Sequence, residues 1–219
     1  MTRAVDQPEG NYYDKYGSKN PLARRMMDNF LRAFDDITSS IDIQTAYEAG
    51  CGEGHLSLRL ARRGVAVRAS DVSARLIQEA NVLATRERLP AQFECRSIYD
   101  LSAEEASADL AVCCEVLEHL EDTEAAVSIL AQIASPYLVV SVPREPLWRI
   151  LNLARGAYLK DLGNTPGHVQ HWSTGSFLRL LRTRFEVIDT RTPLPWTMAL
   201  CRVPGRTVSK PASRTGTTG

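Results

Sequence analysis

The sequence predicts one α/β domain built on a mostly parallel sheet with helices on both faces. Short apolar runs alternate with segments of helical apolar spacing through most of the chain. A glycine-rich turn follows the first apolar run, at residues 50–54. The size agrees, because 219 residues with 44% hydrophobic and 24% charged side chains are typical of one globular domain.

Local signals place the first elements. A helix is expected from Pro21, because Asn20 is a good N-cap and proline suits the first helical position. Gly64 and Pro90 end the next two helices, and Ser73 caps the second of them. The expected helices lie at about 55–63, 73–89, 123–134 and 174–182.

Seven strands are expected between these helices. The run at 109–114 is strongly apolar, which predicts a strand buried on both faces. The last two strands read as a closing pair. The expected strands lie at about 41–49, 65–70, 93–96, 109–114, 137–142, 185–190 and 198–203. The result is a Rossmann-like seven-stranded sheet.

The domain is expected to cover residues 1–203. An N-terminal lid and helix occupy 1–37, and a substrate-side insertion at 143–173 breaks the regular pattern with a loop rich in Gly, Pro and His. From residue 204 onward, Thr, Ser, Gly, Pro and cations replace apolar residues. Residues 204–219 are therefore expected to form a disordered tail.

Charge and cysteine content limit the partners. Lys+Arg and Asp+Glu both total 26, which argues against DNA or an acidic membrane surface bound mainly through charge. The sequence has no apolar run near the ~20 residues that span a bilayer, and its start resembles no secretory signal. Its five cysteines lack C-x-x-C spacing, which predicts neither a zinc site nor a disulfide framework. A cytoplasmic location is expected.

A glycine loop is the first candidate site. Residues 48–54 read Glu-Ala-Gly-Cys-Gly-Glu-Gly between a strand and a helix. Glycines there allow a sharp turn and close approach of a ligand beside free helix N–H groups. Asp71 ends the next strand, where a carboxylate can accept hydrogen bonds from a ribose diol. The alternatives are a plain tight connection and a helix cap ahead of Ser73.

The spacing of this loop separates two nucleotide ligands. A pyrophosphate binder has G-x-G-x-x-G, whereas this loop has G-x-G-x-G with Glu48 ahead of it. An acid there would repel a pyrophosphate but suits a cation. S-adenosyl-L-methionine (SAM) carries a sulfonium and an ammonium and no phosphate, so the pattern favours SAM over NAD.

Together with the E-V-L-E-H-L segment at 115–120, this loop and Asp71 resemble the class I SAM-dependent methyltransferases. The resemblance covers roughly residues 40–190 and is greatest to the ubiquinone-biosynthesis group of small-molecule methyltransferases. It implies that Asp71 binds the ribose, that Val72 lies against adenine and that the turn at 97–98 covers the adenine edge. The cofactor-binding residues that it implies are Glu48, Gly50, Cys51, Gly52, Gly54, Asp71, Val72, Ser97, Ile98 and Glu115.

Histidines are the candidate general bases. His119 or His168 is expected in that role, because imidazole titrates near working pH. The alternative for His168 and His171 is that they only hydrogen-bond the insertion to the sheet. The E-x-x-E-H stretch also resembles the metal ligands of ubiquinone O-methyltransferases and small-RNA 2′-O-methyltransferases, so Glu115, Glu118 and His119 are an alternative Mg²⁺ site. A further histidine, at 168 or 171, would help complete it. The other interpretation is polar packing at a helix start without a metal.

Aromatic residues are the candidate substrate contacts. Tyr12, Tyr13 and Tyr16 resemble a mobile lid over the site, although the same residues could anchor that segment as an apolar patch. Trp148 in the insertion could wall an apolar pocket or belong to ordinary core. His171 and Trp172 complete the expected substrate side.

The resulting hypothesis is methyl transfer from SAM to a small-molecule acceptor, at a hydroxyl oxygen, by in-line displacement. The alternatives are an RNA 2′-O-methyltransferase and a SAM-binding protein without methyl transfer, with an NAD-dependent oxidoreductase more distant. Nucleic-acid binding is disfavoured, because the sequence has no basic stripe with interleaved aromatics. The sequence leaves the acceptor and the oligomeric state open.

Overall fold

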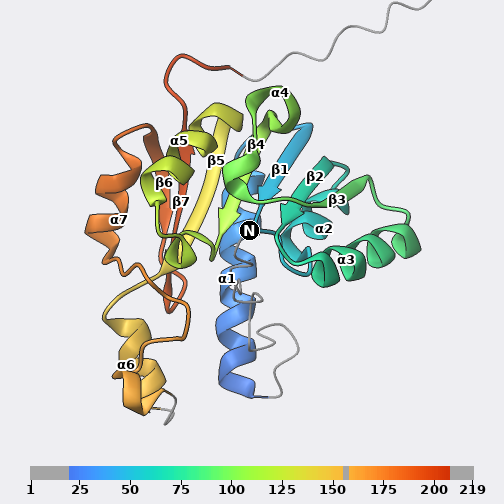
Figure 1. The fold of residues 1–219 in the computed structure, drawn as a ribbon. Coiled ribbons are helices and arrows are strands. Elements are labelled where there is room, and N and C mark those ends of the chain that lie inside the picture. The colour runs from blue at the N-terminus through green and yellow to red at the C-terminus, as the bar shows by residue number, and fades with distance from the viewer. Residues whose placement is uncertain (1–19, 155–157, 208–219) are drawn as a thin grey trace, which may run out of the picture.

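The computed structural model describes residues 20–154 and 158–207. Its centre is a seven-stranded sheet in the order β3-β2-β1-β4-β5-β7-β6 (Figure 1). Strands β1 to β5 pair in parallel, and β7 runs antiparallel to both β5 and β6. The strands are β1 (Thr45–Ala49), β2 (Ala66–Asp71), β3 (Ala91–Cys95), β4 (Ala108–Cys114), β5 (Ala134–Pro143), β6 (Glu186–Arg191) and β7 (Trp196–Arg202). The predicted fold class is confirmed.

Helices cover both faces of this sheet (Figure 1). The α-helices are α1 (Pro21–Ser39), α2 (His55–Ala61), α3 (Ala74–Glu87), α4 (Ala103–Ala106), α5 (Thr123–Ile133), α6 (Leu147–Ala154) and α7 (Thr174–Leu181). Three 3₁₀ turns are η1 (Ile98–Asp100), η2 (Leu117–His119) and η3 (Leu159–Asp161). Helices α1, α2 and α3 pack on one face, and α4, α5 and α7 pack on the other.

Alternation along the strands builds these two cores. All seven residues of β4 are buried, as its apolar sequence predicts. Cys113 belongs to the cluster under α5, whereas its neighbour Cys114 belongs to the cluster under α1. All five cysteines are free thiols.

The start of β1 differs from the prediction. The strand begins at Thr45, whereas the apolar pattern suggests a start near residue 41. The backbone N–H groups of Gln44 and Thr45 both donate to Asp109 Oδ2, at 2.9 Å each. The Asp109 side chain on β4 therefore accepts the hydrogen bonds of the N–H groups at the point where β1 begins.

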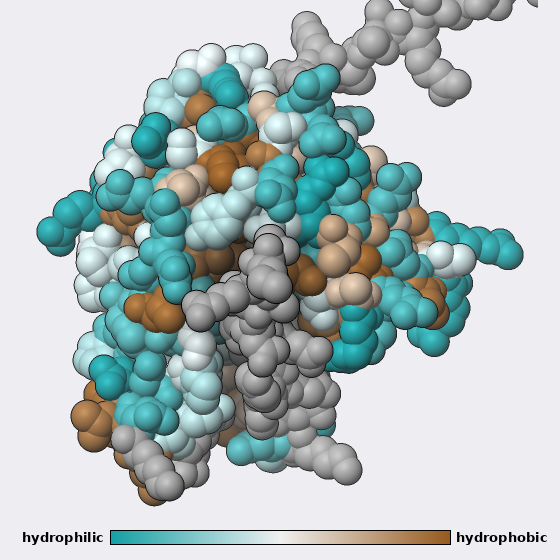
Figure 2. All heavy atoms as spheres, viewed as in Figure 1, coloured by the Kyte–Doolittle hydropathy of each residue, from teal (hydrophilic) through white to brown (hydrophobic). Residues whose placement is uncertain are grey.

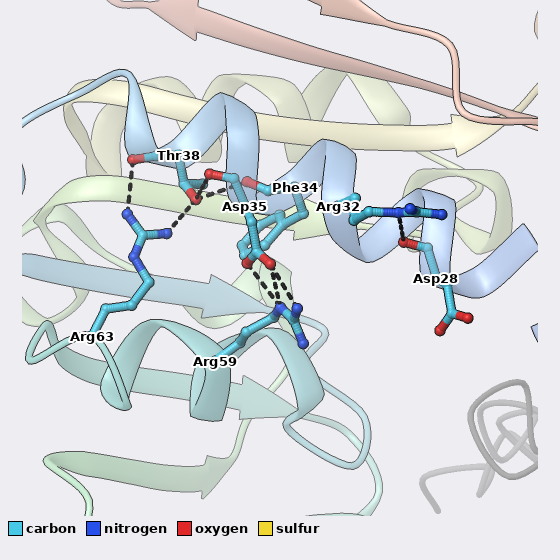
Figure 3. A network of polar contacts seen from close by, with 7 residues as sticks. All are labelled: Asp28, Arg32, Phe34, Asp35, Thr38, Arg59 and Arg63. Atoms are coloured by element: carbon cyan, nitrogen blue, oxygen red, sulfur yellow. Dashed lines mark hydrogen bonds and ion pairs between the residues drawn. The ribbon is translucent and has the colours of Figure 1, made fainter. Parts of the chain in front are cut away.

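Helix α1 is a core element that is tied to α2 (Figure 3). Its N-cap is Asn20, which accepts from Leu22 N, as predicted. The Arg59 guanidinium donates three hydrogen bonds of 2.6–2.9 Å to the Asp35 carboxylate. Arg63 donates to the hydroxyl and the carbonyl of Thr38, near the end of α1. The predicted tyrosine lid at Tyr12, Tyr13 and Tyr16 lies outside the described residues, as does the tail beyond residue 207.

Replacing Arg59 with alanine is expected to lower the free energy of unfolding by about 0.5–1 kcal/mol, because the pair is bidentate but about one-third exposed. Arg75→Ala is the matched control, since its pair with Glu79 is within one helix and more exposed. It should cost less than about 0.5 kcal/mol. Urea unfolding measures both, and equal losses would contradict the assignment of a link between α1 and α2.

The segment after β5 continues through α6 and η3 beyond the carboxyl end of that strand (Figure 1). The buried Asn152 amide donates to Gly163 O and Thr165 Oγ1, which ties α6 to the loop that follows it. Across the two described ranges, the structure contains no helix with the length and apolar character needed to cross a bilayer.

Candidate active site

The glycine loop connects β1 to α2 at the carboxyl edge of the sheet. Gly50, Gly52 and Gly54 have φ of +76°, +52° and +76°, a backbone region that favours glycine. The N–H groups of Gly50 and Cys51 both donate to Ser70 O, at 2.8 and 3.0 Å. The loop is thus fixed to the end of β2 as well as to β1.

Two of these glycines also lie where a side chain has no room. A Cβ on Gly50 would overlap the branched side chain of Val116, which follows β4. A Cβ on Gly54 would lie 2.7 Å from Phe93 Cε1 on β3. The loop therefore packs directly against residues from neighbouring strands, and glycine is needed for space as well as for conformation.

Asp71 links the loop to the next helix. Its Oδ2 accepts from Gly52 N at 2.8 Å, and its Oδ1 accepts from Ser73 N at 2.9 Å. The first bond joins the two motifs that the sequence singled out, and the second matches the capping alternative. A role of Asp71 in binding ribose remains a prediction.

The three residues that are predicted to lie near the adenine, Val72, Ser97 and Ile98, differ in how exposed their side chains are. Val72 is 45% exposed at the end of β2, next to Cys95. The Ile98 side chain is instead buried in the core under α5. Ser97 Oγ accepts from Tyr99 N and caps η1. Of the three, Val72 has the most exposed side chain, and Ser97 is partly exposed.

Glu48 lies beneath the loop, where it binds the start of α2. Its Oε2 accepts from Ser57 N at 2.9 Å and from Ser57 Oγ at 2.5 Å. Burial, only partly offset by these bonds, raises the pKa of Glu48 to about 8. A cofactor contact by Glu48 remains a prediction, and its observed partner is Ser57. The neighbouring Cys51 is also buried, and burial raises the pKa of its thiol.

The raised pKa of Glu48 predicts a pH dependence of stability. Between its ordinary value of 4.5 and about 8, the unfolded chain has lost this proton and the folded protein keeps it. The free energy of unfolding should therefore fall as pH rises through this window. In Glu48→Gln, which cannot titrate, that slope should be smaller. Urea unfolding of both proteins at several pH values across the window measures the difference, and identical slopes would contradict the prediction.

Glu115 follows β4 with φ +61°, an uncommon conformation for a residue with a side chain. Its Oε2 accepts from the indole Nε1 of Trp196 at 2.5 Å, and its Oε1 accepts from Ser141 Oγ at 3.2 Å. Its backbone N donates to Ser141 O at 3.1 Å. Three bonds from β5 and β7 thus hold a strained residue at the carboxyl edge of the sheet.

Glu118, His119 and His168 form a second cluster. A carboxylate oxygen and two ring nitrogens from these residues lie within 4.8 Å of one another. His119 Nδ1 is 3.0 Å from the carbonyl oxygen of Gly167. Because a carbonyl only accepts, Nδ1 donates this bond, and the neutral form of the ring would then have its lone pair on Nε2.

This cluster agrees only in part with the metal set that the sequence suggests. Among the described residues, His168 joins Glu118 and His119 in the group, and Glu115 does not. Two imidazole nitrogens and one carboxylate suit Mn²⁺ or Zn²⁺ better than Mg²⁺, which takes oxygen ligands. The expectation of Mg²⁺ finds no support in this donor set.

Aromatic rings continue from His168 toward the sheet. Trp148 on α6 stacks on His168, with ring centroids 5.9 Å apart and planes at 25°. Trp148 also contacts Trp196, with ring centroids 5.8 Å apart, and Trp196 in turn contacts Phe30 of α1 at 5.1 Å. These contacts bring the predicted substrate residue Trp148 next to the predicted base His168.

The other two predicted substrate residues of the insertion lie elsewhere. His171 Nε2 donates to Asn164 Oδ1 at 2.8 Å, within the insertion itself. Trp172 packs on Phe177 of α7, with ring centroids 6.0 Å apart.

Apolar side chains also face outward on the insertion, where brown gathers at the lower left of Figure 2. They are Ile150, Leu153, Leu159 and Leu162.

Sequence reasoning missed three supporting residues. Ser57 binds Glu48, and Ser141 and Trp196 bind Glu115. Trp196 is 81 positions from Glu115, so no local spacing could reveal the pair. The predicted strand at 198–203 begins after Trp196, whereas β7 begins at Trp196, so the pattern did not place this indole in the sheet.

Comparison with known proteins adds an independent observation. A family model described as a methyltransferase domain matches residues 46–136. The ubiquinone biosynthesis O-methyltransferase of Xanthomonas oryzae pv. oryzae is 31% identical over 198 residues, which cover 84% of this chain and 80% of that protein. The protein of the same name from Coxiella burnetii is 28% identical over 149 residues, which cover 61% of this chain and 63% of its own length. The chain thus spans less than two thirds of the Coxiella protein.

The fold also resembles solved structures. Magnesium protoporphyrin IX methyltransferase (ChlM) from Synechocystis PCC 6803, with bound S-adenosyl-L-homocysteine (SAH), matches with a TM-score of 0.67 and 20% identity. The match covers 86% of this chain and 91% of that chain, and it shows the likeness of the fold. With the glycine loop, the sheet order and the Xanthomonas relative in agreement, this chain belongs to the class I SAM-dependent methyltransferases.

Proposed function

We propose that this protein transfers a methyl group from SAM to a hydroxyl oxygen of a small molecule. Family membership supports SAM as the donor, and the relatives named O-methyltransferases support oxygen as the acceptor. The observation that carries the proposal is the hydrogen bond from His119 Nδ1 to Gly167 O at the carboxyl edge of the sheet, which orients the ring and leaves Nε2 to act as the base. A hydroxyl acceptor must lose a proton, and this imidazole is suited to take it.

The cofactor would lie over the glycine loop. Gly50, Gly52 and Gly54 present bare backbone there, and Asp71 stands beside them at the end of β2. Ligands of open α/β sheets bind outside the carboxyl ends of the strands, where these groups meet. On binding, Asp71 would exchange its bond from Gly52 N for ribose hydroxyls or share its oxygens between them.

His119 would act as the general base. Its lone pair on Nε2 accepts the hydroxyl proton while the acceptor oxygen bonds to the methyl carbon. The carbon–sulfur bond breaks in the same step, and its electron pair stays on sulfur, which turns the sulfonium into the neutral thioether of SAH. His168, with its ring centroid 4.9 Å from that of His119, would limit the rotation of the base. Alignment of the methyl donor and the acceptor oxygen within ~3–3.5 Å would supply the remaining rate enhancement.

A divalent cation is the alternative use of the same side chains. Glu118, His119 and His168 would hold it, and a bound cation would lower the pKa of the acceptor hydroxyl. The proposal assigns the proton to His119 without it. Activity that survives EDTA supports this assignment. Loss of activity to EDTA that Mn²⁺ or Zn²⁺ restores would contradict it.

The test is a screen of acceptors with the purified protein and SAM. Phenols, hydroxy acids and sugars are incubated with and without EDTA, and mass spectrometry detects SAH and a product in which methyl replaces one hydrogen. The expected result is SAH formed in step with an O-methylated product. Binding of SAM without SAH formation from any acceptor would favour a SAM-binding protein, and salt-sensitive methylation of RNA in a parallel arm would favour the nucleic-acid alternative.

A further inference from the structure

Trp196 is buried at the start of β7, between elements from distant parts of the chain. It is 3% exposed and packs on Phe30 of α1 and on Trp148 of α6. Its Nε1–H donates to Glu115 Oε2 at 2.5 Å. Because rings from two helices contact the indole, its N–H has a fixed direction, and the bond also fixes the carboxylate.

The second oxygen of Glu115 is held as well. Ser141 on β5 donates its hydroxyl to Oε1, and its carbonyl accepts from the Glu115 backbone N–H. A carboxylate with one donor on each oxygen cannot turn without losing a hydrogen bond. Its charge is therefore fixed in place by β5 and β7.

The residue that carries this carboxylate is next in sequence to a residue that touches the glycine loop. Val116, the next residue, packs directly on Gly50, where it leaves no space for a Cβ. Glu115 thus lies at the end of β4, next to the loop over which the cofactor is proposed to bind. A fixed carboxylate at this edge of the sheet favours a cationic ligand over a neutral one of the same shape.

We propose that Trp196 is a positioning residue, which orients Glu115 so that the site distinguishes the sulfonium of SAM from the neutral thioether of SAH. The inference rests on the proposed function. SAM and SAH differ by one methyl group and one positive charge, so the ratio of their affinities measures the potential at the sulfur. A change in the shape of the site alone weakens the binding of both ligands, whereas a misdirected carboxylate weakens the binding of SAM selectively.

Trp196→Phe tests this, because it keeps an aromatic ring against Phe30 and Trp148 and removes the N–H. Calorimetry with SAM and with SAH should show SAM binding weakened about three- to tenfold and SAH binding changed by less than about twofold. Glu115→Gln should shift the ratio in the same direction by at least as much. The double variant should go no further than Glu115→Gln, because Trp196 acts through that carboxylate.

Thr197→Val is the matched control. Thr197 is buried next to Trp196 on the same strand, and its hydroxyl bonds to Thr174 Oγ1 instead. The variant also loses one buried hydrogen bond, so its stability should fall while the ratio of SAM to SAH affinity stays as in the wild type. A second measurement avoids reliance on the folding of Trp196→Phe: the NMR resonance of the Trp196 indole N–H should move upfield in Glu115→Gln, as its hydrogen bond weakens.

The outcomes separate the two proposals. A wild-type protein that binds neither SAM nor SAH overturns the proposed function, and this inference with it. If the wild type binds both, an unchanged ratio in Trp196→Phe overturns the inference alone, and so does a ratio that moves equally in Thr197→Val. An indole resonance unaffected by Glu115→Gln also overturns it.

Discussion

Gly50→Ala is expected to abolish detectable SAM binding and to lower the free energy of unfolding by about 2–4 kcal/mol. The first cause is conformational, because φ at this position is +76°. The second is steric, since the new Cβ would overlap the Val116 side chain. Relief of the overlap would move the loop relative to β4 and distort the bonds that the Gly50 and Cys51 N–H groups donate to Ser70 O.

Two further variants separate the causes. Gly52→Ala has only the conformational cost of about 1 kcal/mol, because its φ is +52° and no atom lies within 4 Å of a Cβ there. Gly50→Ala combined with Val116→Ala removes most of the overlap and should recover part of the stability and of the affinity. Urea unfolding and calorimetry with SAM measure both quantities. A Gly50→Ala protein as stable as Gly52→Ala would show that the contact with Val116 costs nothing.

The parts of the fold that follow from local chemistry were predictable from the sequence. Asn20 and Ser73 cap α1 and α3 where the sequence places them, because a cap needs only its own helix. The burial of β4 on both faces follows from its continuous apolar run. The start of β1 did not follow, since it depends on Asp109 from another strand, which takes the N–H groups of residues 44 and 45.

In the candidate site, too, some features follow from local sequence and others depend on distant residues. The glycine loop and Asp71 are read from one short segment and one spacing, and the structure joins them through the bond from Gly52 N to Asp71. The E-x-x-E-H stretch is different, because its spacing brings the acids together only on a continuous helix. Glu115 instead has a left-handed backbone, and Glu118 and His119 belong to the separate turn η2.

Partners for these side chains therefore come from elsewhere in the chain. The insertion supplies His168 to the pair Glu118 and His119, and the last strand supplies Trp196 to Glu115. Such pairings depend on how the insertion and β7 return to the carboxyl edge of the sheet. A sequence pattern fixes the period of an element, but the meeting of distant elements is decided by the packing of the whole sheet.

His119→Ala is expected to lower kcat about 10²- to 10³-fold with SAM affinity within about twofold of the wild type. The reason is that the proposed base is lost while the glycine loop and Asp71 are untouched. His119→Asn is the sharper variant, because its side-chain amide can still donate to Gly167 O in place of Nδ1 but cannot take a proton. It should be as slow as His119→Ala.

The pH profile of SAH formation, with an acceptor from the screen, provides the second readout. In the wild type the rate should fall at low pH as the imidazole becomes protonated, and this acid limb should be absent from His119→Asn. A His119→Asn protein that keeps both its rate and the acid limb would remove His119 as the base. The same measurement on His168→Ala would then decide whether the neighbouring imidazole takes the proton, because both rings belong to one cluster.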